Sequence, residues 1–301
     1  MQITITGSTG FVGTNLSAYL KDKEHTIETL SLRGDWLAQL NPAADAIIHL
    51  AGKAHDVENA DDASEYFKVN RDLTIDLFDE FLKSDIQDFF FFSSVKAVAD
   101  TVEGVLYEDV MPKAVTPYGK SKQEAETYLL NQQLPEGKRL FIIRPCMIHG
   151  PGNKGNLNLL YKVVHKGIPW PLAAFENQRS FLSIDNLSFL IVEMLRNKEV
   201  ASGIYNFADD ETISTNQLIK IIGKASGKKT NLWNISSSLI KGVAKIGDKL
   251  KLPLNTERLK KLTESYVVSN KKIKTALNIN KLPLSAEEGL EKTVKSFKGS
   301  K

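Results

Sequence analysis

The sequence predicts an α/β fold, a doubly wound parallel sheet with a smaller, mostly helical lobe towards the C-terminus. Two patterns carry this prediction. As far as about residue 150, short apolar runs of strand length alternate with amphipathic stretches, the order expected of repeated strand–helix–strand units. After Pro151 the alternation fades, and residues 216–301 show mainly helical spacing, with turns at Gly227, Pro253 and Pro283. The predicted domains are residues 1–152 with about 183–210, and about 153–182 with 211–301.

Each element of the sheet domain has its own signal. Residues 3–6 form a β-branched run that ends in a glycine turn, and residues 11–20 continue with helical spacing. Residues 89–92 are all phenylalanine, apolar on both faces as a parallel strand covered by helices requires. The remaining expected strands are 26–32, 45–50, 140–143 and 203–207, and the remaining expected helices are 63–82, 117–130 and 184–195.

The composition excludes several classes of protein. With 42% apolar and 25% charged residues the chain is ordinary for a globular protein, and no apolar run approaches the roughly 20 residues that span a bilayer. Residues 1–7 have the pattern of a strand and a turn, not of a signal peptide. The single cysteine, Cys146, excludes an internal disulfide and offers no metal-ligand spacing. We therefore expect a cytoplasmic protein without a bound metal.

The last third of the chain is basic. Residues 220–301 hold 19 Lys and Arg against 6 Asp and Glu, while the formal net charge of the whole chain is +3. A solvated lysine-rich face is the simplest explanation, and an anionic ligand, partner or surface is the alternative. These lysines lack interleaved aromatic residues for stacking on bases, so we expect no nucleic-acid partner. Residues 236–246 fit a helix packed in the lobe, which is the simpler interpretation, or a basic amphipathic helix at a membrane surface.

Three glycines between the first strand and the first helix predict a dinucleotide site. Gly7 permits a tight turn, Gly10 lets the backbone approach a pyrophosphate, and Gly13 allows the helix to pack closely on the strand. The amides at the N-terminus of the helix favour phosphate. The placement between strand and helix, more than the spacing alone, indicates the cofactor site. The residues expected around the phosphates are Gly7, Thr9, Gly10, Phe11, Val12 and Gly13.

The end of the second strand bears on the choice of cofactor. An acidic residue there would bind the adenosine 2′-hydroxyl of NAD, but this sequence has Ser31 near the expected position and Arg33 close behind. A hydroxyl and an arginine suit a 2′-phosphate, which favours NADP while leaving NAD open. Asp35 could take the NAD role in a tight loop, and Arg33 could equally be a surface charge.

Tyr118, Lys122 and Ser94 form the candidate catalytic set. Tyr118 and Lys122 stand at i and i+4 on one face of a predicted helix, and a nearby ammonium lowers a tyrosine pKa towards the range useful for acid–base catalysis. Ser94 follows the strand 89–92 and so lies at the carboxyl end of the sheet, where open α/β folds bind ligands. A Tyr-x-x-x-Lys pair alone is common on helix surfaces. Its combination with the glycine turn and the strand-end serine indicates a catalytic set.

These and other motifs follow one another in a known order: residues 6–13, Leu50-Ala51-Gly52, Asn70, Ser93-Ser94, Tyr118 to Lys122, and Arg144-Pro145. In this the sequence resembles the extended short-chain dehydrogenases/reductases, the NAD-dependent epimerase/dehydratase family. The resemblance implies a seven-stranded Rossmann-type sheet and a smaller lobe for a nucleotide diphosphate sugar. It also implies Tyr118 as acid/base, Lys122 on the nicotinamide ribose and Ser94 on the substrate oxygen. Further cofactor contacts are expected at Leu50, Ala51, Gly52, Asn70, Ser93 and Pro145, and at Tyr118 and Lys122 of the catalytic set.

The resemblance extends to a narrower branch. Val95 and Lys96 follow Ser94 where the family's 4,6-dehydratases have Asp-Glu, so dehydration is not expected. Residues 150–156, 170–172 and 177–181 resemble UDP-hexose 4-epimerase-like proteins and UDP-4-keto-6-deoxy-N-acetylhexosamine 4-reductases of bacterial polysaccharide pathways. This similarity implies diphosphate contacts, and a guanidinium fork suits phosphate oxygens. The expected substrate contacts are Ser94, Lys96, Tyr118, Asn156, Arg179 and Arg258.

Two departures and several alternatives stay open. His149 replaces a tyrosine common in the family, and a packing role is the simpler interpretation. The segment between Arg33 and Asp45 is short for the family, a second departure, on the adenosine side of the cofactor site. The reaction is a 4-epimerisation or a 4-keto reduction; the alternatives are a catalytically silent dinucleotide-binding regulator and a reductase of a non-sugar ketone. Helices 63–82 and 117–130 could form a homodimer interface.

Overall fold

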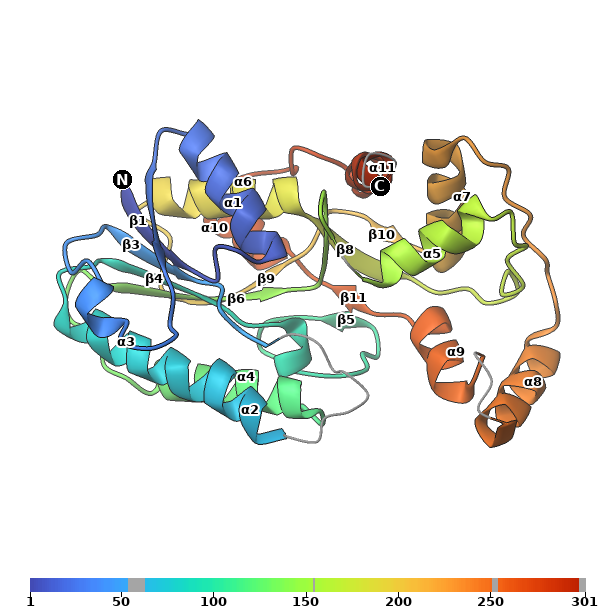
Figure 1. The fold of residues 1–301 in the computed structure, drawn as a ribbon, viewed down its shortest axis with the longest axis horizontal. Helices are drawn as coiled ribbons and strands as arrows, with labels where there is room; N and C mark the ends of the chain where they lie inside the picture. Colours follow the sequence, from blue (N-terminus) through green and yellow to red (C-terminus); the bar gives the residue numbers. More distant parts are fainter. Residues whose placement is uncertain (54–62, 154, 251–253, 298–301) are drawn as a thin grey trace.

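The computed structural model describes residues 1–53, 63–153, 155–250 and 254–297. Its centre is a six-stranded parallel sheet in the order β2-β1-β3-β4-β6-β9 (Figure 1). The strands are β1 Gln2–Thr6, β2 Thr26–Leu30, β3 Ala46–His49, β4 Asp88–Phe92, β6 Arg139–Pro145 and β9 Gly203–Phe207. The strand order reverses between β1 and β3, as in a doubly wound sheet, so the predicted fold class is confirmed.

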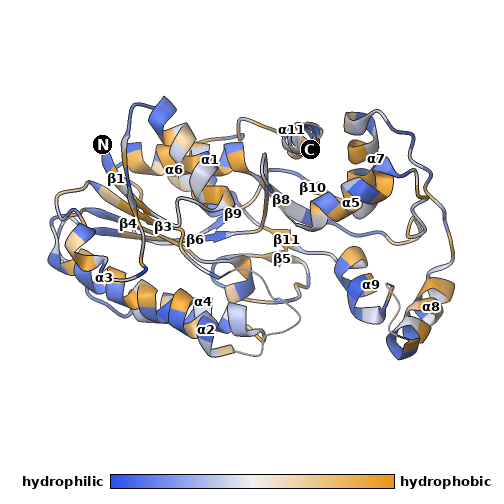
Figure 2. Cartoon of the chain, viewed as in Figure 1, coloured by the Kyte–Doolittle hydropathy of each residue, from blue (hydrophilic) through white to orange (hydrophobic). Residues whose placement is uncertain are grey.

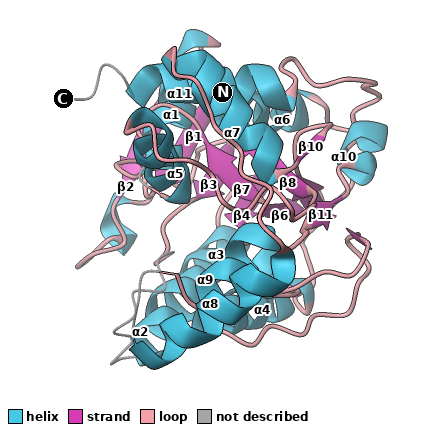
Figure 3. Cartoon of the chain, turned by 90° about the vertical axis from the view of Figure 1, so that its right-hand side faces the viewer, coloured by secondary structure: helices cyan, strands magenta, loops and turns pink. Residues whose placement is uncertain are grey.

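Helices cover both faces of this sheet. α1 (Phe11–Asp22) and α6 (Ile184–Arg196) pack together on one face, while α3 (Leu73–Lys83) and α4 (Pro117–Leu130) lie on the other (Figure 3). Because both faces are covered, the strands are apolar throughout, and every residue of β4 is buried. α4 begins at a Thr116 cap followed by a proline in the first turn, which fixes where the helix starts.

The sheet has six strands where the family resemblance implied seven. Only residues 31–45 connect β2 to β3, and they contain one short 3₁₀ turn, Leu37–Gln39. A parallel crossover takes about a dozen residues or more, so this segment can cross β1 once but cannot also supply a further strand. The sheet therefore ends at β2, and the seven-strand expectation was wrong.

The strands end at a common edge, where the predicted site residues gather. Thr6, the last residue of β1, pairs with Leu30 of β2 and with His49 of β3. Phe92, the last residue of β4, pairs with Ile143 of β6. The glycine turn and the serines that follow β4 leave their strands at this edge, so segments far apart in the sequence meet there.

A second lobe lies beyond this edge, on the right of Figure 1. It holds a three-stranded sheet in the order β10-β8-β7, made of β7 Met147–His149, β8 Arg179–Ser183 and β10 Thr212–Ile213. Its helices are α5 Asn156–His165, α7 Thr215–Ser226, α8 Ser237–Leu250, α9 Thr256–Thr263 and α11 Ala286–Phe297. A reciprocal capping box between Ser214 and Gln217 starts α7, and Gly227 with φ +69° ends it.

The hydrophobic cores of the two lobes alternate along the chain. The core of the second lobe takes its residues from β8 and from the helices that surround it. After α9, Val268, Ile273 and Leu282 rejoin the core of the sheet domain, before α11 returns to the second lobe. They come from β11 (Val267–Val268), which pairs with β5 (Val105–Leu106), from α10 (Lys271–Ala276) and from the loop after it. The predicted division into domains stays a prediction, and part of its C-terminal segment packs on the sheet.

The helix predicted over residues 63–82 is interrupted in the structure. α2 (Ala63–Phe67) passes into a π-helical turn at Lys68–Asp72 before α3 begins. A π turn changes the direction of the side chains that follow, and such turns are frequent at functional sites. Here the turn buries Asn70 completely and places it behind the carboxyl edge of the sheet.

Candidate active site

The glycine turn forms a cradle that has no room for side chains. Gly7 has φ +67°, and a Cβ there would lie 2.7 Å from the backbone nitrogen of Ala51. A Cβ on Gly13 would lie 2.6 Å from Cα of Ser8, so the first turn of α1 approaches β1 this closely only with glycine. α1 starts at Gly10 without a side-chain cap, which leaves its first amides for a ligand. The cradle fits the pyrophosphate of a dinucleotide.

The loop after β2 lies next to this cradle, because β1 and β2 end at paired residues. Ser31, Arg33 and Asp35 are all exposed there. The amide of Arg33 donates to Oγ of Ser31 at 3.4 Å, so the first two residues share one turn. The loop therefore presents a hydroxyl, a cation and a carboxylate where the adenosine end of a dinucleotide would lie.

A chain of buried hydrogen bonds, which the sequence analysis missed, runs behind the cradle. Nδ1 of His49 lies 2.7 Å from Thr6 Oγ1, and its Nε2 lies 2.9 Å from Thr74 Oγ1. Thr74 donates to the carbonyl oxygen of Asn70 at 2.9 Å, and Thr6 Oγ1 accepts the amide of Ala51 at 3.2 Å. Burial lowers the pKa of His49 to about 3, so the ring is neutral. If its proton is on Nε2, every donor and acceptor in this chain of hydrogen bonds has a partner. In the sequence, the one sign of this network was a histidine inside an otherwise apolar strand.

Asn70 joins the cradle to the catalytic helix. Its side-chain amide donates to the Lys53 carbonyl oxygen at 3.0 Å and to Ser121 Oγ at 3.1 Å, and its Oδ1 accepts the Lys53 amide at 2.8 Å. A Cβ on Gly52 would lie 3.0 Å from Asn70 Oδ1 and 3.3 Å from Lys122 Nζ. The structure therefore brings together Gly52, Asn70 and Lys122, three of the residues predicted to contact the cofactor.

Tyr118 is placed by the start of α4. A Cβ on the next residue, Gly119, would lie 2.5 Å from the carbonyl oxygen of Lys96, so α4 begins directly against the short 3₁₀ turn that follows Ser94. The half-buried ring of Tyr118 meets the ring of Tyr66 edge-on, with the centroids 6.4 Å apart. The predicted tyrosine and the predicted serine therefore belong to two segments in contact.

Lys122 lies one helical turn beyond Tyr118 and is almost fully enclosed, with 4% of its surface exposed. Its Nζ donates to the Phe92 carbonyl oxygen at 2.9 Å and lies 4.6 Å from the centroid of the Phe91 ring. Burial lowers the pKa of Lys122 to about 7, and the charge of Glu126 opposes that shift. This amine can therefore hold or release a proton near neutral pH on the helix face it shares with Tyr118.

The two serines after β4 have different partners. Ser93 Oγ donates to Glu126, whose carboxylate also accepts two guanidinium nitrogens of Arg144, Nη2 at 2.5 Å and Nε at 3.0 Å. Both members of this ion pair are buried, a feature that the sequence analysis did not assign. Ser94 Oγ accepts the amide of Lys96 at 3.1 Å, and its own proton has no acceptor among the described residues. The Ser93 hydroxyl anchors the turn, while that of Ser94 can donate to a ligand.

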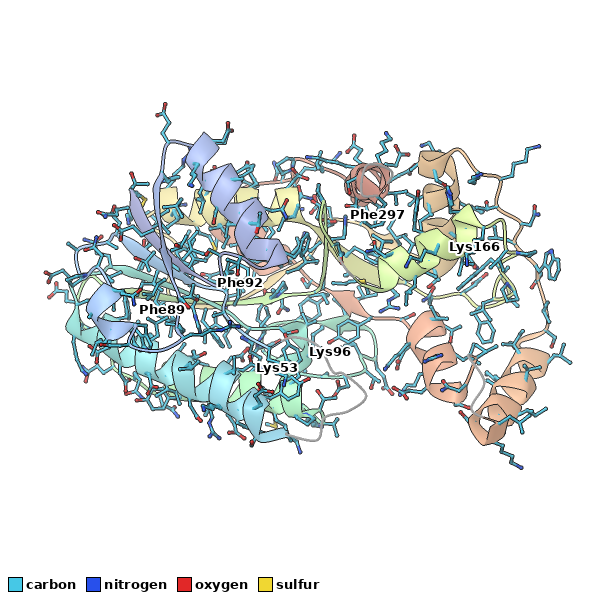
Figure 4. All side chains as sticks on the ribbon, in the orientation of Figure 1. Lys53, Phe89, Phe92, Lys96, Lys166 and Phe297 are labelled. Atoms are coloured by element: carbon cyan, nitrogen blue, oxygen red, sulfur yellow. The ribbon has the colours of Figure 1, made fainter. Side chains whose placement is uncertain are left out.

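Tyr266, which the sequence analysis also missed, ties the second lobe to this turn. Its hydroxyl lies 2.7 Å from the Ala99 carbonyl oxygen and 3.2 Å from that of Val95, and Lys96 Nζ lies 4.7 Å from the centre of its ring. Figure 4 labels Lys96 on this turn, and Phe92 at the end of β4. The backbone of Tyr266 pairs with Arg179 at the start of β8. One tyrosine thus connects a predicted diphosphate contact to the turn that carries Ser94.

A pocket of about 290 Å³ opens in the second lobe among α5, β8 and α9. Its lining is mainly apolar and includes Trp170 and Phe181, but Arg179, Arg258 and Lys261 also border it. Arg179 donates to the Lys261 carbonyl oxygen at 2.6 Å, and burial lowers its pKa. The structure therefore brings the two predicted arginines to one pocket. Asn156 begins α5, and its side chain lies outside the described part of the structure.

His149 lies away from this pocket, inside the second lobe. Its Nδ1 lies 2.9 Å from Thr293 Oγ1, its Nε2 lies 3.6 Å from an Asp209 oxygen, and its ring meets Phe181 edge-on. His149 therefore packs β7 against α11, which is a structural role. Cys146 is buried, and burial raises its pKa. Across the described ranges no group of three His, Cys, Asp or Glu side chains is placed to hold a metal ion.

The chain is similar to known proteins in both sequence and fold. Residues 3–208 match the NAD dependent epimerase/dehydratase family. The chain is 30% identical to a UDP-glucose 4-epimerase of Vibrio cholerae, over 98% of this chain and 95% of that protein. It is 27% identical to a GDP-6-deoxy-D-mannose reductase of Pseudomonas aeruginosa, over 73% and 79%. The fold is similar to that of RMD from Pseudomonas aeruginosa complexed with NADPH, with TM-score 0.76 and 20% identity over 100% and 99% of the two chains.

The matched region contains the cradle, the strand-end serines and the helix that carries Tyr118 and Lys122, so the family match and the site geometry concern the same residues. The chain belongs to the NAD dependent epimerase/dehydratase family.

Proposed function

We propose that this chain is an NAD(P)-dependent oxidoreductase that acts at C4 of a UDP-hexose or a UDP-4-keto-hexose. One observation carries the proposal. The turn with Ser94 contacts the start of the helix that bears Tyr118 and Lys122, and Tyr266 links the same turn to the pocket with Arg179. A hydride cofactor on one side and a diphosphate on the other would meet at Tyr118. The epimerase and the reductase among the relatives support this class of reaction.

Each residue of the catalytic set then has a distinct role at the C4 oxygen. When bound, the nicotinamide accepts or donates the hydride of C4. Tyr118 takes the proton from the C4 hydroxyl during oxidation and returns one to the C4 oxygen during reduction. The Lys122 ammonium stabilises the phenolate form of Tyr118, and the Ser94 hydroxyl donates to the same oxygen of the sugar.

The pocket of the second lobe would take the nucleoside diphosphate. Arg179 and Arg258 supply planar donors that match phosphate oxygens, and the apolar lining accommodates the base. Because Arg179 is desolvated, a bound anion would compensate its charge. Arg179→Met should raise the KM for the UDP-sugar by roughly tenfold to a hundredfold. Arg196→Met, at an exposed arginine that pairs only with Glu193 among the described residues, is the matched control and should leave the KM unchanged.

The 4-epimerase and the 4-keto reductase are the two forms of this proposal, and each rests on its own observation. The epimerase agrees with the relative that matches over nearly the whole chain. The reductase agrees with Ser31 and Arg33 after β2, which suit an exchangeable NADPH. A silent regulator would not need an enclosed lysine beside a tyrosine, and a pocket bordered by two arginines is unsuited to an uncharged ketone.

The decisive experiment incubates the protein with a UDP-4-keto-6-deoxy-N-acetylhexosamine and NADPH or NADH, and in parallel with UDP-glucose or UDP-N-acetylglucosamine without added cofactor. Stoichiometric loss of reduced nicotinamide that requires Tyr118 establishes the reductase. Conversion of a UDP-hexose to its C4 epimer without net oxidation establishes the epimerase with a retained cofactor. Loss of NADPH preference in Arg33→Ala would support the 2′-phosphate role, and inactivity with every UDP-sugar would refute the proposal.

The setting of the enzyme is also a proposal. We place it in the cytoplasm, where nucleotide sugars are made, and as a homodimer through the surface of α3 and α4. Tyr128 of α4 donates to Asp79 of α3 at 2.9 Å, and Arg71 of the π turn before α3 pairs with Glu124 of α4 at 2.7 Å, so this surface is held together within one chain. Analytical ultracentrifugation would show a monomer if the dimer is wrong.

A further inference from the structure

α8 carries two apolar faces, and only one of them is covered. Ile240, Ala244 and Gly247 are buried against the rest of the lobe. Gly247 approaches so closely that a Cβ there would overlap the backbone of Leu254, just before α9. This face accounts for the packed helix that the sequence predicted.

The second face of α8 is open. Leu239, Val243, Ile246 and Leu250 are 61%, 44%, 55% and 66% exposed. They stand at i, i+4, i+7 and i+11 and so form one stripe along the helix. Figure 2 shows the apolar positions of α8, which lies at the outer end of the second lobe. None of the helices in the described ranges could span a bilayer.

Lysines occupy a second exposed side of α8: Lys249 lies next to the apolar stripe, whereas Lys241, two residues from Leu239, lies nearly opposite it. Lys241, Lys245 and Lys249 are exposed on α8, and none of them forms an ion pair with a described residue. The one acidic residue of the helix, Asp248, is occupied by the backbone amide and hydroxyl of Thr256. The basic charge here is therefore not neutralised within the described lobe.

Two of these lysines also border a groove. Lys241 and Lys245 line it from α8, and Lys260 lines it from α9. The groove has a volume of about 370 Å³, and no carboxylate of the described residues lines it. Lys260 also pairs with Glu264 at 3.9 Å, so Lys241 and Lys245 supply most of the positive charge, which favours a small anionic group such as a phosphate.

We propose that α8 docks on an anionic lipid bilayer, with Leu239, Val243, Ile246 and Leu250 in the headgroup region and Lys245 and Lys249 on lipid phosphates. Helices of this kind combine buried apolar area with attraction to anionic lipids, and the lysine stems reach past the apolar stripe to the phosphates. A second copy of the chain is a poorer occupant. A two-fold interface would place the same lysines opposite one another, where like charges repel.

The docking surface shares no residue with the catalytic set or with the pocket that holds Arg179 and Arg258. The proposal is therefore independent of the proposed reaction, and either can fail without the other. It does have a spatial consequence. Because α8 packs on α9, and α9 carries Arg258, docking brings that side of the pocket towards the lipid surface.

The test is sedimentation of the full-length protein with vesicles of phosphatidylcholine alone and of phosphatidylcholine with phosphatidylglycerol. We expect binding to the anionic vesicles that falls as salt is added. The double variant Val243→Ser and Ile246→Ser should lower the partition coefficient by at least ~tenfold, and Lys245→Glu with Lys249→Glu should do the same. Leu130→Ser removes a side chain of 48% exposure at the end of α4 and is the matched control that keeps binding.

Three outcomes would overturn the proposal. The first is that the wild-type protein does not bind anionic vesicles. The second is that the α8 variants bind as well as the wild type. The third is that the wild type is a dimer which the Val243→Ser and Ile246→Ser variant converts to a monomer, because a second copy then covers the stripe. Since all substituted side chains are exposed, circular dichroism melting curves should match the wild type and exclude unfolding as the cause.

Discussion

Replacement of Lys122 by methionine should stabilise the folded chain. Burial lowers the pKa of Lys122 to about 7 from its ordinary 10.5, and one pKa unit corresponds to about 1.4 kcal/mol, so protonating this group costs the folded state roughly 5 kcal/mol. Methionine fills a similar volume without a charge. It loses the hydrogen bond to Phe92 and the attraction of Glu126, so we expect a net gain of about 2–4 kcal/mol at neutral pH.

The sign of the pH dependence gives a sharper test. Between about pH 7 and pH 10.5 the unfolded chain keeps the Lys122 proton while the folded chain releases it. The unfolded state then binds more protons, so this group makes stability rise with pH, by at most about 1.4 kcal/mol per pH unit. Lys122→Met should lack this component. Lys120→Met, at an exposed position on the same helix, should keep it.

The assay is urea unfolding of wild type and both variants across that pH range, with the difference between each pair of free energies as the readout. Titration of every other group cancels in the difference. A difference between wild type and Lys122→Met that does not change with pH would refute the desolvation argument, as would destabilisation by Lys122→Met at every pH. The variant should lack catalytic activity in either case.

Three further predictions concern the same site. Tyr118→Phe keeps the ring but removes the acid/base, so it should lower turnover by roughly 10²–10⁴-fold and cofactor affinity far less, as steady-state kinetics and a cofactor titration would show. Gly13→Ala should destabilise the fold by about 1–3 kcal/mol and weaken dinucleotide binding, because its Cβ would lie against the Ser8 backbone; a thermal melt and a titration check both. Arg144→Met leaves the Glu126 carboxylate buried without its partner and should cost about 3–5 kcal/mol, whereas Arg144→Met with Glu126→Met should recover most of that loss in urea unfolding.

The regular elements of the sheet domain could be predicted because each has a local signal. The phenylalanines of β4 and the spacing of Tyr118 and Lys122 are visible in one stretch of sequence, and the structure has β4 and α4 where they were expected. The glycine turn was predictable because its spacing stands in one stretch of sequence, and the crowding at Gly13 comes from Gly7 and Ser8 nearby, whereas the crowding at Gly7 comes from the distant Ala51.

The features that the sequence analysis missed depend on partners distant in the sequence. Tyr266 contacts the turn after Ser94 across about 170 residues, and such a contact leaves no period in the sequence. The apolar spacing across the π turn at Lys68–Asp72 is close to that of an ordinary helix, so the sequence predicted one uninterrupted helix there. The six-strand sheet was foreseeable from the short connection before β3, but the family resemblance favoured seven.

The alternation of the two cores along the chain has a mechanical consequence. The backbone leaves the sheet domain and returns to it more than once, with Val268 and Ile273 in the sheet core late in the chain, so several segments connect the two lobes. Any opening must bend several connections at once, so the lobes should lose their amide protection together and melt in one transition.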